Sequence, residues 1–282
     1  MKNFFNWVLT IAIFITSMVT IFILTVGSLT TKESTKTIID NIDYNEVIKE
    51  FESSDYGNYI YEYANNHGID KDQINSLLQS NETKEYSNEI IQGIINSYLN
   101  NQDIKISNKT KEYINKINNK YKLNLDDNSK KEIEDYTNNF IEGTLNSEIK
   151  NTYNNSEIEN EGQQALISII KTCQDNSLHT TLYTIITILV ICLFLNTLKK
   201  KNFLEYIGIV FITIGIFTLL LNGIISLLTK DTTSFLASAK VILLPITNNF
   251  YLISLISIIL SIVFFIIQHL INKHQNKEVV PF

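Results

Sequence analysis

The chain contains no arginine, so all 23 of its basic residues are lysines. Lysine cannot make the paired, parallel hydrogen bonds by which one guanidinium recognises a phosphate or carboxylate. Cysteine is also scarce, with only Cys173 and Cys192, and no Cys-x-x-Cys motif or Cys/His cluster occurs. We therefore expect no disulfide framework, no structural metal site and no other cofactor.

Charged residues are missing from four long stretches. No Asp, Glu or Lys occurs in residues 3–31, 176–198, 206–229 or 241–272. About 20 apolar residues are enough to span the hydrocarbon core of a bilayer. The sequence therefore predicts a multi-pass membrane protein with four transmembrane helices, at residues 1–31, about 178–198, about 204–228 and about 250–271.

The first stretch is longer than a secretion signal requires. Its apolar run from Trp7 to Leu29 exceeds the 7–15 residues typical of the apolar core of a signal peptide. Residues 1–31 are therefore interpreted as an uncleaved signal anchor. The small residues Val26-Gly27-Ser28 leave a cleaved signal peptide as the alternative.

Proline occurs only twice, and Pro245 interrupts the last apolar stretch. Because proline lacks a backbone N–H and disrupts a helix interior, we expect it to end one helix. The apolar spacing predicts a short helix at about 234–244 lying in the membrane interface, followed by the fourth span. Residues 273–282 then form a cytoplasmic tail.

Lysines flank the spans unevenly. Lys2, the run from Lys199 to Lys201, and Lys273 with Lys277 would all lie on one side of the membrane. Because cytoplasmic loops carry an excess of positive charge, we expect both termini in the cytoplasm of a cell membrane. The segment 32–175 would then be extracellular.

Residues 32–175 hold 26 acidic residues against 15 lysines. An acidic domain repels nucleic acid, so we expect no nucleic-acid partner. Proline is absent and apolar residues recur at helical spacing, so the fold class is predicted to be all-α, with a large helical domain between the first and second spans. The predicted helices are 36–52, 56–66, 70–80, 83–100, 108–120, 129–150 and 156–198, the last joining domain and membrane without a break.

Several residues indicate where these helices begin and end. Asp70-x-x-Gln73, Ser129-x-x-Glu132 and Ser156-x-x-Glu159 have the form of capping boxes, and Gly68 is placed to end a helix. Residues 85–97 also align with residues 135–147 at a constant offset of 50. This similarity predicts a tandem helical repeat, which would favour a binding or scaffold surface over a catalytic cleft.

Small and polar residues line up along two of the spans. The third carries Gly208, Gly215 and Asn222, and the fourth carries Ser254, Ser257 and Ser261. Small residues let helix backbones approach closely, so these six positions are predicted to pack the bundle. A polar transport path is the alternative interpretation, although no ionisable residue reaches a predicted midplane.

Two resemblances bear on function. The segments Gly68–Leu78 (GIDKDQINSLL) and Asp103–Asn108 (DIKISN) resemble parts of uncharacterised membrane proteins of low-GC Gram-positive bacteria, which implies no particular activity. One span, a large outward domain and three further spans resemble the permease subunits of MacB/FtsX-type ABC transporters. That resemblance implies that domain and spans move together.

The leading hypothesis is a non-enzymatic membrane protein whose outward domain binds or scaffolds another envelope or membrane protein. A permease-like subunit is the alternative, although the loop from Lys199 to Glu205 is short for contact with an ATPase. An enzyme acting on lipid or cell wall is least favoured, since no catalytic motif or catalytic residue is recognisable. The bilayer is the expected partner in each case, and self-association is left open.

Overall fold

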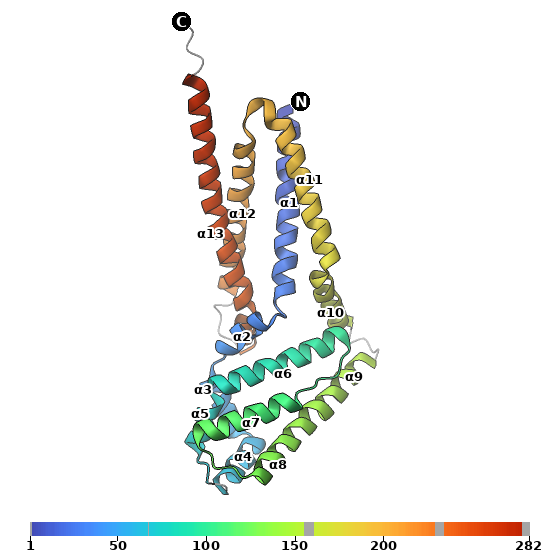
Figure 1. Ribbon diagram of the computed structural model, residues 1–282, viewed down its shortest axis with the longest axis vertical. Helices are drawn as coiled ribbons and strands as arrows, with labels where there is room; N and C mark the ends of the chain where they lie inside the picture. The colour runs from blue at the N-terminus through green and yellow to red at the C-terminus, as the bar shows by residue number, and fades with distance from the viewer. Residues whose placement is uncertain (1, 67, 155–160, 229–233, 278–282) are drawn as a thin grey trace. The chain divides into compact units, whose positions relative to one another are not determined.

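The computed structural model describes all residues except 1, 67, 155–160, 229–233 and 278–282 (Figure 1). Within the described residues every element of regular secondary structure is a helix. Four of these helical segments have the length and apolarity of membrane spans: Asn3–Ser28, Asn176–Lys200, Phe203–Leu227 and Leu243–His274. The predicted fold class is therefore confirmed, including the large helical segment between the first and second spans.

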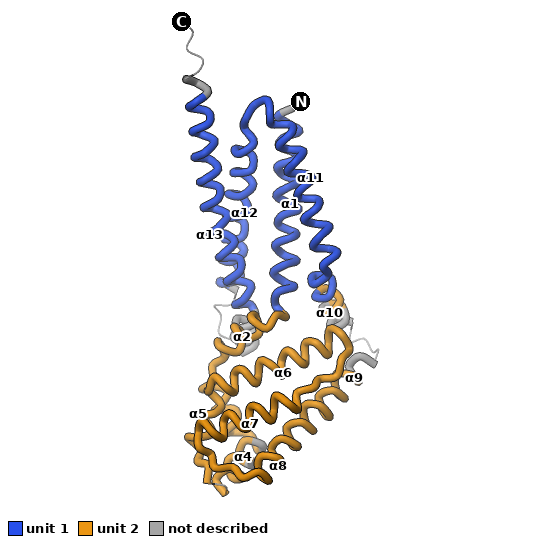
Figure 2. Tube along the Cα trace, viewed as in Figure 1, with its two compact units in different colours: residues 1–29, 170–282 blue, residues 30–169 orange. Residues whose placement is uncertain are grey.

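The chain divides into two compact units, coloured separately in Figure 2. The first comprises residues 1–29 and 170–282 and contains all four spans. The second comprises residues 30–169 and is referred to below as the helical domain. Each unit has its own buried side chains and is described by itself.

The spans form a bundle of four helices: α1 (Lys2–Ser28), α11 (Asn176–Thr197), α12 (Phe203–Leu228) and α13 (Ser234–Lys277). Its core joins Ile13 of α1, Leu193 of α11 and Val210 of α12, each at most 3% exposed. Large apolar side chains such as Ile11 and Leu220 point outward and are more than half exposed. Because water rarely faces so many large apolar groups, this outer surface fits the hydrocarbon of a bilayer.

Threonine hydroxyls inside the bundle donate to carbonyls of their own helices. Thr10 donates to the Asn6 carbonyl at 2.8 Å, and Thr218 donates to the Ile214 carbonyl at the same distance. A polar group without a partner is costly in an apolar surrounding. These threonines therefore enter the bundle without leaving a hydroxyl unpaired.

The prediction that Pro245 divides the last stretch is wrong, because α13 runs through it as one helix. Proline costs this helix one backbone hydrogen bond, but its fixed φ is compatible with a helix. Helix interiors in membranes tolerate proline where neighbouring groups satisfy the backbone that it frees. Pro245 is buried, so its ring is packed inside the bundle. The segment 234–244 is the first part of α13 rather than a separate helix.

The predicted continuous helix 156–198 is also wrong. It is broken at Asp175, between α10 (Glu161–Gln174) and α11. The Asp175 backbone is extended, and its carboxylate accepts a hydrogen bond from the Ser177 amide at 2.8 Å, so it caps α11. His179 Nε2 lies 2.7 Å from the Cys173 carbonyl near the end of α10. The capping box predicted at Ser156 lies outside the described residues.

The helical domain contains eight α-helices and one π-helical segment among its described residues. In chain order these are α2 (Lys32–Asp40), α3 (Tyr44–Ser53), α4 (Asp55–Asn66), α5 (Lys71–Leu78), α6 (Asn81–Asn100), α7 (Ser107–Tyr121), α8 (Asp127–Asn138), the π-helix Asn139–Leu145 and α9 (Asn146–Asn154). The segment predicted as one helix, 36–52, is divided between α2 and α3. Asp43 is the N-cap of α3, and its side chain accepts a hydrogen bond from the Asn45 amide.

Cap residues were predicted with mixed success. Asp70 and Gln73 form both halves of a capping box at the start of α5. Gly68 has a φ of 78°, the left-handed conformation that favours glycine, and follows the end of α4. Ser129 is not the N-cap of α8, however. The N-cap is Asp126, three residues earlier, whose carboxylate accepts from the Ser129 amide at 2.7 Å.

An ion pair joins α6 to α7. Glu82, in the first turn of α6, is only 8% exposed, and both its carboxylate oxygens lie 2.9 Å from Lys120 Nζ. Lys116 Nζ is 3.9 Å from the same carboxylate. The hydrogen bond from Lys120 holds the pKa of Glu82 below its ordinary value. This contact stabilises the pairing of the two helices only while Glu82 is ionised.

We predict that Glu82→Gln lowers the free energy of unfolding of the helical domain by roughly 1–3 kcal/mol at pH 7, because a charged hydrogen bond is lost. Because the pKa of Glu82 is lowered in the folded state, the contact contributes fully above the unfolded pKa of about 4.3 and is lost as pH falls through the folded pKa. The difference should therefore begin to shrink below about pH 4 and vanish only below the folded pKa. Urea unfolding followed by circular dichroism measures it. The matched control is Glu112→Gln, whose side chain is 72% exposed. Equal stability of the two variants at pH 7 would contradict the assignment.

Candidate functional site

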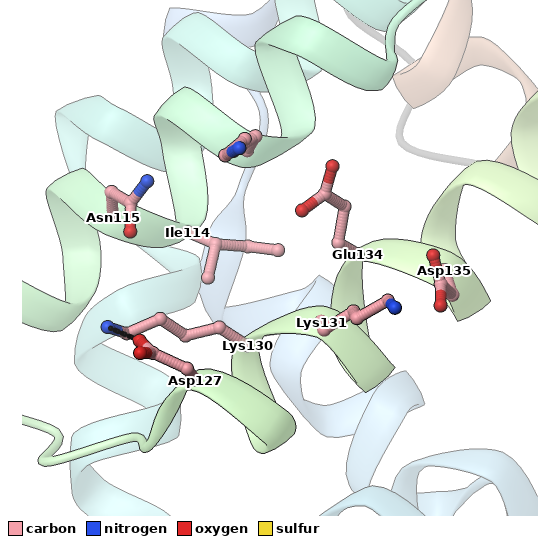
Figure 3. Close-up of a pocket in the computed structure, with 8 residues that line it drawn as sticks. Ile114, Asn115, Asp127, Lys130, Lys131, Glu134 and Asp135 are labelled. Atoms are coloured by element: carbon pink, nitrogen blue, oxygen red, sulfur yellow. Dashed lines mark hydrogen bonds and ion pairs between the residues drawn. The ribbon is translucent and has the colours of Figure 1, made fainter.

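A groove of about 410 Å³ lies between α7 and α8 in the helical domain (Figure 3). Helix α7 lines it with Lys111, Ile114 and Asn115, and α8 lines it with Asp127, Lys130, Lys131, Glu134 and Asp135. We call these eight residues the α7–α8 groove. Ile114 is 3% exposed and extends from α7 toward the centre of the groove. The groove thus combines an apolar floor with charged walls.

The charges around the groove are balanced in sign, with three lysines and three carboxylates. Lys130 Nζ pairs with Asp127 at 3.2 Å, at one end of the groove. The side chains of Lys111, Lys131, Glu134 and Asp135 form no ion pair with any described residue. Figure 3 shows Glu134 extending from α8 toward α7. Four charged side chains without an ion pair to a described residue therefore surround the one apolar side chain of the groove, Ile114.

Helix α7, which forms one side of the groove, is capped by a residue distant in sequence. Ile106 occupies the N-cap position of α7, and its side chain makes no capping hydrogen bond. Glu142, which belongs to the π-helix, caps α7 instead. Its Oε1 accepts from the amides of Ile106 and Ser107 at 2.6 and 2.8 Å, and from the Ser107 hydroxyl at 2.7 Å. A carboxylate at a helix N-terminus satisfies free N–H groups and opposes the helix dipole. This contact fixes α7 relative to the segment that follows α8.

Burial and hydrogen bonding act on Glu142 in opposite directions. Burial acts to raise the pKa of this carboxyl, but the hydrogen bonds from Ser107 and Ile106 outweigh it, and the pKa lies below its ordinary value. The charged form is therefore the one that holds α7 in place. Asn146 adds to the contact, because its side chain accepts from the Ile104 amide at 2.8 Å and donates to the Ile104 carbonyl at 3.2 Å.

On the other side of α7 lies a set of tyrosines that packs it against α6. The rings of Tyr86 and Tyr113 are parallel, with centroids 4.4 Å apart. Their hydroxyls each pair with a threonine, Tyr86 with Thr110 and Tyr113 with Thr83, both at 2.8 Å. Burial raises the pKa of both tyrosines. Helix α7 is thus supported on its α6 side by ordered, neutral side chains.

The six residues predicted to pack the bundle are placed on α12 and α13. Ser254 Oγ donates to the Gly215 carbonyl and Ser261 Oγ donates to the Gly208 carbonyl, both at 2.8 Å. A Cβ on Gly215 would lie 2.7 Å from Ile258 Cγ1, so only glycine fits there. The structure brings these four residues together in two pairs.

The other two predicted residues make no such pair. Ser257 is 5% exposed and lies between the two bonded serines on α13. Asn222 is half-buried and makes no hydrogen bond with any described residue. That the six positions hold the bundle together stays a prediction.

The segments of the predicted repeat occupy different settings. Residues 85–97 lie within α6, whereas residues 135–147 cross from α8 through the π-helix into α9. A Cβ on Gly93 would lie 2.8 Å from an Ile104 methyl group, whereas one on Gly143 would meet nothing within 4 Å. Gln92 and Glu142, one repeat apart, both contact the start of another helix. The repeat stays a prediction.

Sequence reasoning did not single out any residue of the groove. Isolated lysines and carboxylates are ordinary on a solvated helix, and only the pairing of α7 with α8 brings these together. Nor did it single out Glu142, whose role depends on a residue 35 positions earlier. The described residues contain no group of three or more His, Cys, Asp or Glu side chains that could hold a metal ion.

No family model matches the chain, and neither a curated protein nor a solved structure matches it. Its class follows from the structure itself. Four helices long and apolar enough to span a bilayer make it an integral membrane protein, with a helical domain inserted between the first and second spans. The bilayer is therefore a partner of the chain.

We predict that Gly215→Leu destabilises the bundle by roughly 1–3 kcal/mol, because the new side chain collides with Ile258. Gly223→Leu is the matched control in the same helix, since a Cβ there meets nothing within 4 Å. Thermal unfolding of the two purified proteins in detergent measures the difference. Equal melting temperatures for the two variants would show that the α12 to α13 contact is not the close one described.

Proposed function

We propose that the chain presents its helical domain outside the membrane and binds another envelope or membrane protein through the α7–α8 groove. The observation that carries the proposal is the groove itself, in which four unpaired charged side chains surround the buried Ile114. Protein interfaces commonly combine an apolar centre with a polar rim that sets orientation and specificity. The role is that of a membrane-anchored binding or scaffold protein.

The orientation rests on the distribution of charge. Lys199, Lys200 and Lys201 lie between the second and third spans, whereas the helical domain is acidic. The excess of lysine supports a cytoplasmic position for this loop. Because one span separates the loop from the helical domain, the domain would then lie on the other side of the membrane. A binding partner would then be extracellular or in the same membrane.

Photocrosslinking in the native cells tests the proposal. A benzophenone amino acid at Asn115, in the groove, is expected to capture one protein partner, whereas the same label at the exposed Asn58 of α4 is not. Lys111→Glu with Lys131→Glu should lower the yield of the Asn115 adduct at least about tenfold, because the groove would repel a complementary surface. Lys36→Glu with Lys49→Glu, at two exposed lysines without an ion pair to any described residue, is the matched control and should leave the yield unchanged.

Two outcomes would overturn the proposal. One is an adduct of equal yield from Asn115 and Asn58, which would show that the captured protein contacts the domain without preference for the groove. The other is an adduct from Asn115 that the groove variant leaves unchanged while the variant protein remains folded by circular dichroism.

A further inference from the structure

One end of the membrane bundle carries a short turn rich in lysine. Helix α11 ends at Thr197, a single 3₁₀ turn covers Leu198–Lys200, and α12 begins at Phe203. Lys199, Lys200 and Lys201 are all exposed. The second span reaches Lys200 and the third begins at Phe203, so these three lysines lie where a span meets the headgroups of a bilayer.

Buried polar side chains hold this turn in one conformation. Lys201 has a φ of 51°, and its carbonyl accepts from Gln268 Nε2 of α13 at 2.8 Å. Its amide donates to the Thr197 carbonyl at 2.9 Å, and Thr197 is fully buried. Asn6 of α1, 1% exposed, pairs with Asn196 one residue before Thr197. Three helices thus fix the backbone from which the lysines project.

The positive charge of the turn is not neutralised by neighbouring carboxylates. Lys199 and Lys201 form no ion pair with any described residue, and Lys200 bonds only to the neutral amide of Asn3. Glu205, the nearest acidic residue along the chain, makes no ion pair with Lys201. Three cationic groups are therefore available within one turn.

A hydrogen-bond acceptor and the start of a helix adjoin these lysines. Asn202 Oδ1 is buried and has no partner among the described residues, so Asn202 does not cap α12. No other described side chain caps the first turn of this helix. The N–H groups there favour a negative charge, and Glu205 already supplies one in this turn.

We propose that the turn from Lys199 to Lys201 binds the phosphate of an anionic phospholipid headgroup. The charge of the turn is complementary to that phosphate, and its position at the end of two spans is where a headgroup lies. Clusters of basic residues beside a span, and basic pockets between spans, recognise anionic lipids in this way. This site lies in the bundle and is independent of the α7–α8 groove.

The only tryptophan of the chain offers a direct readout. Trp7 of α1 packs edge-on against Tyr206 near the start of α12, with ring centroids 5.9 Å apart, and is 48% exposed. Lipids with brominated acyl chains quench tryptophan fluorescence when they lie beside it. Quenching of Trp7 in reconstituted bilayers therefore reports which lipid occupies this end of the bundle.

The experiment uses the full chain in mixed bilayers of phosphatidylcholine and phosphatidylglycerol, with one or the other lipid brominated. We expect phosphatidylglycerol to be preferred over phosphatidylcholine beside Trp7 by about fivefold or more. A factor of about five is the gain in affinity that one lysine gives at an anionic lipid surface. The variant with Lys199, Lys200 and Lys201 all changed to Gln should lose the preference. Changing the same three residues to Arg keeps the charge and should keep the preference. Lys36, Lys49 and Lys122, exposed in the helical domain and all changed to Gln, form the control and should leave it intact.

Three results would overturn the proposal. Equal quenching by the two brominated lipids in the unmodified chain would show no selectivity. A preference that survives the triple Gln variant would place the lipid site elsewhere. Loss of the preference on adding inorganic phosphate, but not on adding sodium chloride of equal ionic strength, would show that the turn takes free phosphate rather than a lipid headgroup.

Discussion

The requirement that every backbone polar group in lipid find a partner within the protein governs this structure. Only helices meet it within a single segment, so the four stretches without charge are all helical. The same requirement extends to side chains. Thr218 bonds to its own helix, and Ser254 and Ser261 bond to carbonyls of the neighbouring α12. Because these serines reach another helix, they add specific contacts to a bundle that has no hydrophobic driving force between its spans.

The helical domain follows different rules because it is solvated. Most of its helices begin at local caps such as Asp70 and Asp126, but α7 is held by side chains distant in sequence. Glu142 caps α7, and Glu82 pairs with Lys120, so the position of α7 depends on two carboxylates that must be ionised. The groove proposed as a binding surface is one side of that same helix. Acidification would therefore be expected to loosen the groove before it affects the serine and threonine hydrogen bonds of the bundle, which do not titrate.

The sequence predicted the spans well because the absence of charge over 20 or more residues has one physical explanation. It failed where a single residue changed the local outcome. Asp175 caps the start of α11, although the spacing of apolar residues does not change at this position. Pro245 lies inside α13, because that helix tolerates the loss of one backbone hydrogen bond. The groove was beyond reach for another reason. Its eight residues are unremarkable in sequence, and only the antiparallel neighbours α7 and α8 bring Lys111 and Glu134 to one surface.

We propose that the helical domain and the loop after the second span lie on opposite sides of a membrane. Cysteine accessibility in intact cells measures this directly, in a chain whose two native cysteines are changed to alanine. Asn119→Cys, in the helical domain, should react with a membrane-impermeant maleimide added from outside. Lys200→Cys should react only after the membrane is permeabilised. Labelling of both positions from outside would contradict the account, because no span could then separate them.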